Sequence, residues 1–217
     1  MKSSDNAEIL YVDNHLVIAA KPCGMLTQPD DTGAPSLEAS VKLWIKNEYQ
    51  KKGNVFLHAI HRLDRVVSGL LLFARTSKSL SRMNEQSRQQ EIQRIYLAEV
   101  EGFLTKKEGQ LDHFLIHGEH RAVIAKKDDP DAKHARLSYK TVKAKAHSTI
   151  VEIELDTGRY HQIRAQFSAI GHPILGDRRY GSQTDGGNAI RLHGWKLLFQ
   201  HPVTKELMAF ETPAPFS

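Results

Sequence analysis

A basic loop runs directly into an apolar segment at residues 58–72, which read His-Ala-Ile-His-Arg-Leu-Asp-Arg-Val-Val-Ser-Gly-Leu-Leu-Leu. The run that begins near Gly69 is typical of a buried strand. One carboxylate, Asp64, stands between Arg62 and Arg65 just before that strand. Adjacent cations favour the ionised form of a carboxylate, which suits a nucleophile or an electrostatic catalyst better than a proton donor. The alternative is a structural ion pair at the start of the strand.

Short strands dominate the rest of the sequence. Residues 9–12 and 16–20 are apolar runs separated by a polar turn, a pattern that predicts a hairpin. Further strands are expected at residues 92–101, 111–117, 137–143, 149–155, 189–199 and 206–210. Many neighbouring strands are joined by segments too short for a crossover helix. We therefore expect an α+β fold with a mixed, largely antiparallel sheet.

Three helices are expected beside this sheet. Ser36 is a good N-cap for a helix that runs to about Gln50, and Ser77 for a second helix that runs to Gln90. A third helix is expected over residues 161–170, where Gly171 would end it.

Basic side chains crowd the start of that third helix, namely Arg159, His161 and Arg164. The helix dipole disfavours cations at this end. We therefore expect an anion beside them, either a protein carboxylate or a phosphate.

The composition, 40% hydrophobic and 25% charged over 217 residues, suits one compact folded domain. A net charge of +5 favours an anionic partner but does not separate a nucleic-acid binder from an ordinary basic enzyme. Residues 118–147 hold eight Lys or Arg against four Asp or Glu, and so carry most of this charge. Lys126 and Lys127 lie in a predicted loop there and are candidate contacts for RNA or DNA phosphates. The alternative is a solvated loop and an edge strand protected by lysines.

The sequence lacks the features that indicate several classes of protein. The single cysteine, Cys23, excludes an internal disulfide and any zinc site with two thiolates. The N-terminus has no secretory signal pattern, and no segment approaches the roughly 20 apolar residues of a membrane helix, so we expect a cytoplasmic protein without a membrane partner. The motifs of P-loop NTPases, dinucleotide-binding enzymes and serine hydrolases are absent.

A metal-dependent hydrolase would be a further reading, with His58, His61 and Asp64 as ligands. No His-Glu-x-x-His pattern and no thiolate pair accompanies these residues. We therefore interpret both histidines as structural.

Tyr96 lies in the expected strand over residues 92–101 and shares a face with the small Ala98, which leaves room beside its ring. A tyrosine in this setting could stack on a nucleobase, or use its hydroxyl as a base or hydrogen-bond partner. The alternative is a tyrosine at the edge of the core.

Four motifs follow one another along the chain. They are Lys-Pro-Cys-Gly-Met at 21–25, His-Arg-Leu-Asp at 61–64 with Ser-Gly-Leu-Leu-Leu at 68–72, Tyr-Leu-Ala-Glu-Val-Glu-Gly at 96–102, and Thr-Gly-Arg-Tyr-His-Gln-Ile-Arg at 157–164 with Gly-His-Pro-Ile-Leu-Gly-Asp at 171–177. In this order they resemble the motifs of the RluA family of RNA pseudouridine synthases.

The resemblance implies the pseudouridine synthase fold, a mixed sheet flanked by helices with the active-site cleft across it. It implies an isomerase that converts uridine in RNA to pseudouridine. The partner would be structured RNA, either tRNA or rRNA, whose target base is flipped out of the stack. No metal or organic cofactor is implied.

The resemblance also assigns roles. Asp64 matches the family's catalytic aspartate, and Arg164 the arginine that pairs with it, which would supply the anion expected at the helix start. Tyr96 matches the tyrosine that packs on the target base and is a candidate for removing the C5 proton. Arg62, by analogy, fills the place of the flipped base or holds a neighbouring phosphate.

The sequence departs from the family pattern at four positions. Val67 stands where threonine is usual, Arg94 where lysine is common, and Gln28 and Gln166 where histidine is frequent. None of these changes removes a catalytic group. We expect them to bear on substrate choice and not on the reaction.

We expect residues 1–217 to form a single catalytic domain that acts as a monomer. The S4 RNA-binding domain of many relatives is not expected, so RNA recognition would rest on the catalytic domain. The alternative is an RNA-binding or folding-assistance module that has the fold without relevant catalysis. The presence of Asp64, Tyr96 and Arg164 weakens that alternative.

Overall fold

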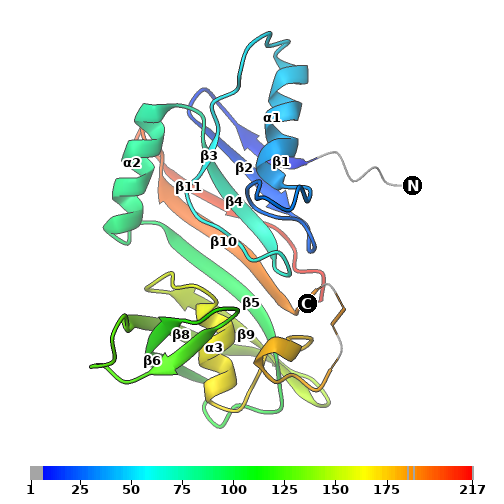
Figure 1. The fold of residues 1–217 in the computed structure, drawn as a ribbon, viewed down its shortest axis with the longest axis vertical. Coiled ribbons are helices and arrows are strands. Elements are labelled where there is room, and N and C mark those ends of the chain that lie inside the picture. Colours follow the sequence, from blue (N-terminus) through cyan, green and yellow to red (C-terminus); the bar gives the residue numbers. More distant parts are fainter. Residues whose placement is uncertain (1–6, 185, 188, 217) are drawn as a thin grey trace. The chain divides into compact units, whose positions relative to one another are not determined.

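The computed structural model describes residues 7–184, 186–187 and 189–216. Its residues group into two compact units (Figure 1). The first unit comprises Met1–Ile92 and Gly194–Thr212, and the second comprises Gln93–His193 and Pro213–Ser217.

The first unit is built on antiparallel strands. They are β1 (Glu8–Val12), β2 (Leu16–Lys21), β3 (His58–Ala59), β4 (Ser68–Ala74), β11 (Leu207–Glu211) and all but the first two residues of β10 (Leu192–Gln200). Strand β2 pairs with β1 and β4, β3 pairs with β4, and β10 pairs with β11. The predicted hairpin and the buried strand that follows Asp64 are confirmed, whereas the short β3 was not predicted.

Two helices belong to this unit, α1 (Leu37–Glu48) and α2 (Ser77–Arg88). Ser36 caps α1 as predicted, because its hydroxyl accepts from the amide of Ala39. The prediction of Ser77 as the second N-cap is wrong by one residue. Thr76 is the cap, and it forms a reciprocal capping box with Ser79, whose hydroxyl accepts from the Thr76 amide.

An apolar core holds the unit together. One cluster joins β2, β4, α2 and β10 through Leu16, Ile18, Leu70, Leu72, Met83, Ile92, Leu197 and Phe199. Gly69 allows two strands to approach, because a Cβ at this position would lie 2.4 Å from the backbone of Gly194, and its φ is +127°. Only glycine tolerates both constraints.

The second unit is also antiparallel, with the strand order β5-β9-β8-β6-β7. These strands are β5 (Gln93–Glu101), β6 (Glu108–His117), β7 (Ala122–Ala125), β8 (Lys133–Ala144) and β9 (Ser148–Leu155). Helix α3 (Gln162–Ala169) and the short 3-10 helix η1 (Arg178–Tyr180) complete it. The short β7 lies within the basic segment 118–147 and was not predicted.

Helix α3 lies against one face of β6 and β8 (Figure 1). Gln166 is fully buried there and donates to the carbonyls of Leu111 and Ala135, at 3.1 and 3.0 Å. No helix within the described ranges is long and apolar enough to cross a membrane.

The capping box of α2 gives a direct stability test. Replacing Thr76 with Ala removes the hydroxyl that accepts from the Ser79 amide, so we expect a loss of about 1 kcal/mol in the free energy of unfolding, measured by urea denaturation. Ser77→Ala is the matched control, since Ser77 is exposed one residue further on, and we expect it to change stability by less than about 0.5 kcal/mol. A larger loss of stability for Ser77→Ala than for Thr76→Ala would mean that Ser77 is the N-cap.

Candidate active site

The backbone before Asp64 is fixed by one buried threonine. The Thr27 hydroxyl donates to the Leu63 carbonyl at 2.9 Å and accepts from the Leu63 amide at 3.1 Å. Thr27 and Leu63 are both buried, and Asp64 itself is partly buried. The carbonyl of Asp64 accepts from the Val67 amide at 3.0 Å, which closes a turn before β4.

The backbone after Asp64 is fixed by the Lys-Pro-Cys-Gly segment. Gly24 donates its amide to the Arg65 carbonyl at 2.7 Å, and its own carbonyl accepts from the Arg65 side chain at 2.9 Å. The Cys23 thiol donates to the Val66 carbonyl at 3.5 Å. Residues 21–27 therefore hold the loop on both sides of the aspartate.

Lys21 is the buried centre of this arrangement, with 1% of its surface exposed. Its ammonium group donates to the carbonyls of Met25, Pro22 and Arg65, at 2.8, 3.0 and 3.4 Å. Burial lowers the pKa of Lys21 to about 8, against the opposing electrostatic effects of Cys23 and Asp64. The group is therefore charged at neutral pH, and its three N–H bonds face three carbonyls.

The histidines near Asp64 have structural contacts. The His58 ring packs against Phe56 in a tilted arrangement with centroids 4.6 Å apart, and Nε2 of His61 accepts from the Leu72 amide at 3.4 Å. Among the residues that the structure describes, no three His, Cys, Asp or Glu side chains are grouped so as to hold a metal ion. Arg62, the other predicted site residue of this loop, is exposed.

Tyr96 lies in the second unit, on β5, opposite Ile153 of β9. It is 7% exposed, and Ala98 on the same face is fully buried. Arg94, two residues earlier, lies against Gly158, where a Cβ would come within 2.7 Å of its guanidinium. Its Nε is buried without a hydrogen-bond partner among the described residues.

Arg164, on α3, forms a buried ion pair with Asp177. Its Nε and Nη2 donate to the two carboxylate oxygens at 2.6 and 2.9 Å, and both residues are at most 4% exposed. The guanidinium also stacks over the ring of Tyr180 at 5.0 Å. The anion expected at this helix start is therefore a protein carboxylate, and the pairing of Arg164 with Asp64 stays a prediction.

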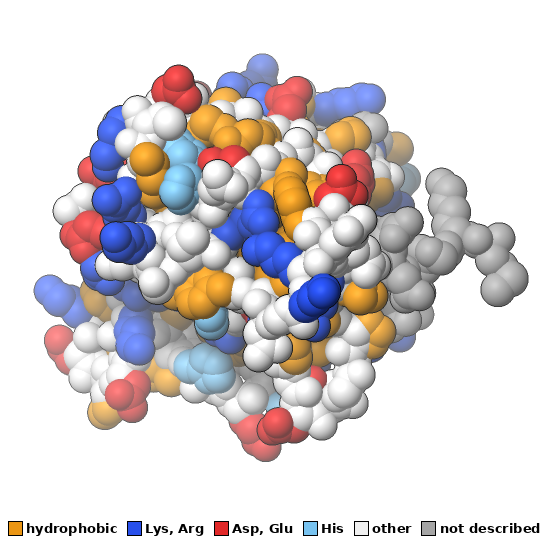
Figure 2. Space-filling view, turned by 90° about the horizontal axis from the view of Figure 1, so that it is seen from above, with side chains coloured by type: hydrophobic (Ala, Val, Ile, Leu, Met, Phe, Trp, Pro, Cys, Tyr) orange, Lys and Arg blue, Asp and Glu red, His pale blue; other side chains and the backbone are white. Residues whose placement is uncertain are grey.

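Lys126 and Lys127 follow β7 in an exposed turn, as the sequence predicted. The Lys126 amide donates to the Asp129 carboxylate at 2.7 Å. Asp128 and Asp131 lie in the same turn, so three carboxylates accompany the two lysines. Figure 2 shows a similar mixture on the face that it draws, where acidic side chains lie among the basic ones.

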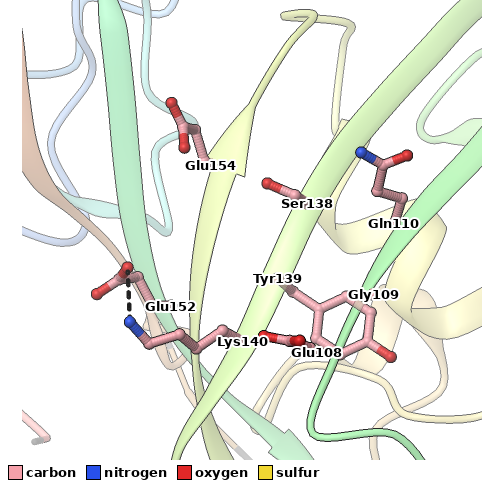
Figure 3. Close-up of a pocket in the computed structure, with 8 residues that line it drawn as sticks. All are labelled: Glu108, Gly109, Gln110, Ser138, Tyr139, Lys140, Glu152 and Glu154. Atoms are coloured by element: carbon pink, nitrogen blue, oxygen red, sulfur yellow. Dashed lines mark ion pairs between the residues drawn. The ribbon is translucent and has the colours of Figure 1, made fainter.

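A pocket of about 400 Å³ lies on the strands β6, β8 and β9 of the second unit (Figure 3). Glu108, Lys140 and Glu152 face one another in register across the three strands, and Lys140 pairs with Glu152 at 3.8 Å. Glu154 adds a third carboxylate to the lining. This excess of acidic groups makes the pocket a poor site for a phosphate-bearing ligand.

Sequence reasoning missed Lys21, Thr27 and Asp177 as parts of the site. Lys21 and Asp177 lie inside the quoted motifs, but the partner of each is set by the tertiary structure. Thr27 carries no signal in the sequence.

The fold is shared with a known class of RNA-modifying enzymes. The human protein named RNA pseudouridylate synthase domain containing 1 superposes with a TM-score of 0.80 at 21% identity, over 100% of this chain and 87% of that one. This likeness confirms the predicted pseudouridine synthase fold.

The family follows from the sequence comparisons. The family described as RNA pseudouridylate synthase matches residues 15–169. The uncharacterised RNA pseudouridine synthase YhcT of Bacillus subtilis is 34% identical, over 96% of this chain and 68% of that protein. The dual-specificity RNA pseudouridine synthase RluA of Escherichia coli is also 34% identical, over 96% of this chain and 93% of that protein. The chain belongs to the RNA pseudouridine synthase family, as an isomerase that converts uridine to pseudouridine in RNA.

The depressed pKa of Lys21 predicts how stability depends on pH. An unfolded lysine keeps its proton to about pH 10, whereas the folded protein releases it near pH 8, so the unfolded chain binds more protons between these values. Stability from this group therefore rises with pH in that interval. We expect the free energy of unfolding of the wild type, minus that of Lys21→Met, to rise by on the order of 2 kcal/mol from about pH 7.5 to about pH 9.5.

Urea denaturation across this pH range measures the difference. The control is Lys51→Met, because Lys51 is exposed in the same unit and should leave the difference flat. If the difference in free energy of unfolding between the wild type and Lys21→Met also does not change with pH, the three carbonyl acceptors of Lys21 keep its ammonium group charged over the whole range.

Proposed function

We propose that this chain binds a structured tRNA or rRNA and isomerises specific uridines through Asp64 as the catalytic aspartate. The observation that carries the assignment is the double restraint on the Asp64 loop by residues 21–27. A catalytic carboxylate must be held in one geometry before the substrate arrives. Backbone contacts on both sides of Asp64 provide this restraint.

The reaction rearranges one glycosidic bond. The bond between N1 of uracil and C1′ of the ribose breaks, the ring turns, and a bond forms between C5 and C1′. The proton on C5 is lost and N1 gains one, so that the product is an isomer of the substrate. Because no water has to be activated, one carboxylate suffices where glycosidases use two. Asp64 attacks or stabilises the cationic sugar carbon.

Tyr96 and Arg164 complete the proposed catalytic set. Tyr96 packs on the target base and is the candidate for removing the C5 proton. Arg164 pairs with the Asp64 carboxylate and orients it. The bidentate contact with Asp177 supports this role, because a guanidinium fixed by two hydrogen bonds has one preferred orientation.

The target uridine leaves the base stack before the reaction, since its C1′ and C5 must both be reached. Arg62 fills the vacated place or holds a neighbouring phosphate, and its exposed position beside Asp64 supports this role. Both units together serve as one catalytic domain, and the chain acts as a monomer.

The role of Asp64 is tested by Asp64→Asn. The amide has the same shape but cannot act as a nucleophile or stabilise a positive charge, so we expect turnover to fall below detection. The assay is tritium release from 5-tritiated uridine in total tRNA and in rRNA, separately and with EDTA present.

Controls keep the result interpretable. The thermal melting temperature and the affinity for RNA should match those of the wild type. Substantial residual turnover in the variant would refute the assignment of Asp64. No release by the wild type from either RNA pool would favour the non-catalytic RNA-binding module.

The proposed contacts of Lys126 and Lys127 with phosphates are tested by replacing both with Gln. If each contacts one phosphate, RNA affinity falls, and the slope of log K against log salt concentration becomes less steep by about 1.4 to 1.8. Filter binding between about 50 and 200 mM salt measures the slope. An unchanged slope would mean that the neighbouring aspartates already neutralise these lysines and that the turn is only solvated.

A further inference from the structure

A second cavity in the second unit differs in charge from the acidic pocket of Figure 3. It has a volume of about 200 Å³ and lies where β6, β7 and β8 meet the loop before α3. Its polar lining comes from His117, Lys133, Arg159 and Tyr160. At about 30 Å³ per water molecule this volume holds roughly seven waters, which is the scale of a single nucleobase.

Stacked rings form one wall of the cavity. His117 stacks on Tyr160 with centroids 4.1 Å apart at 28°, and Tyr160 stacks on His161 at 3.8 Å and 20°. His117 is exposed and forms the outer end of this ladder. A flat base could continue the ladder on His117, because stacking on aromatic or imidazole rings is how proteins bind unpaired bases.

The backbone directly before α3 adopts a strained conformation at His161, the inner residue of the stacked rings. His161 has a φ of +52°, in the left-handed region that few residues other than glycine adopt. For this reason α3 begins at Gln162 and not at the predicted residue 161. Nδ1 of His161 lies 3.0 Å from the Tyr180 hydroxyl, which fixes its ring. Strain of this kind persists where the surroundings impose it and is found most often at functional sites.

Among the described residues, no carboxylate forms an ion pair with the cations of the cavity. Lys133 and Arg159 are exposed, and neither forms an ion pair with any described residue. Arg159 is oriented by the hydrogen bond from its Nε to the His134 carbonyl at 2.8 Å, while its other guanidinium nitrogens have no hydrogen bond within the described part of the chain. Fixed donors without an internal acceptor are suited to a phosphate.

We propose that this cavity is a subsite for one unpaired nucleotide of the substrate RNA, other than the target uridine. The base stacks on His117, and the backbone phosphate binds Lys133 and Arg159. The inference rests on the proposed function and adds to it a substrate class, an RNA loop with at least two unpaired nucleotides.

The test compares His117→Ala and Lys133→Gln with two rescue variants and a matched control. His117→Phe keeps a flat ring and Lys133→Arg keeps the charge. Lys140→Gln removes the same charge from the same strand, β8, but in the acidic pocket (Figure 3). Steady-state tritium release from the RNA pool that the wild type modifies gives kcat and KM for each variant.

We expect KM to rise about fivefold or more for His117→Ala and for Lys133→Gln, with kcat within about twofold of the wild type. The rescue variants and Lys140→Gln should stay within about twofold in KM. For Lys133→Gln alone, the slope of log K against log salt concentration should become less steep by about 0.7 to 0.9. If the KM values of His117→Ala and Lys133→Gln equal that of Lys140→Gln while the wild type is active, the subsite is refuted and the proposed function stands.

If the wild type modifies neither tRNA nor rRNA, the proposed function fails and filter binding of the same variants to both pools decides the subsite. Weaker binding of His117→Ala and Lys133→Gln than of Lys140→Gln would then support it. Equal binding would overturn it.

Discussion

The buried ammonium group of Lys21 is the interaction on which the candidate active site depends. Moving this charge out of water is costly, and only well-placed acceptors compensate for the cost. One of its three carbonyls belongs to Arg65, 44 positions along the chain, and the other two belong to the segment that holds Lys21 itself. The buried charge therefore links residues 21–27 to the loop that carries Asp64. Together with the contacts of Thr27, Cys23 and Gly24 it restrains the backbone on both sides of the aspartate.

The second unit uses a buried charge in a similar way. Arg164 and Asp177 come from the two segments of the fourth motif, one on α3 and one in the loop after it, and they meet in a bidentate pair. Removing either partner would leave a buried charge uncompensated, at a cost of about 3–5 kcal/mol. The pair and the Tyr180 ring restrict the guanidinium to one orientation.

The sequence predicted what depends on local patterns. The strand expected at residues 149–155 is β9, and Ser36 was identified as a cap because it directly precedes residues with apolar helical spacing. The sequence did not predict features that depend on a choice between two suitable residues or on contacts between residues far apart in the chain. Thr76 and Ser77 are both good caps, and the choice is made by the reciprocal hydrogen bond of Ser79. Gln166 was interpreted as a variation that bears on substrate choice, yet it is fully buried and bonded to two backbone carbonyls, which no local pattern reveals.

The net charge of the chain says little about where RNA would bind, because the partners of each lysine decide its effect. Three aspartates share the turn of Lys126 and Lys127, and Lys140 pairs with Glu152 in an acidic pocket. Lys133 and Arg159 line a cavity of the same unit in which no lining residue is acidic. Carboxylates beside a lysine repel a phosphate, whereas a phosphate in a cavity without acidic lining displaces only water and counterions. The acidic neighbours of each lysine therefore matter more than its place in the basic segment, and they favour the cavity beside Tyr160 over the turn after β7.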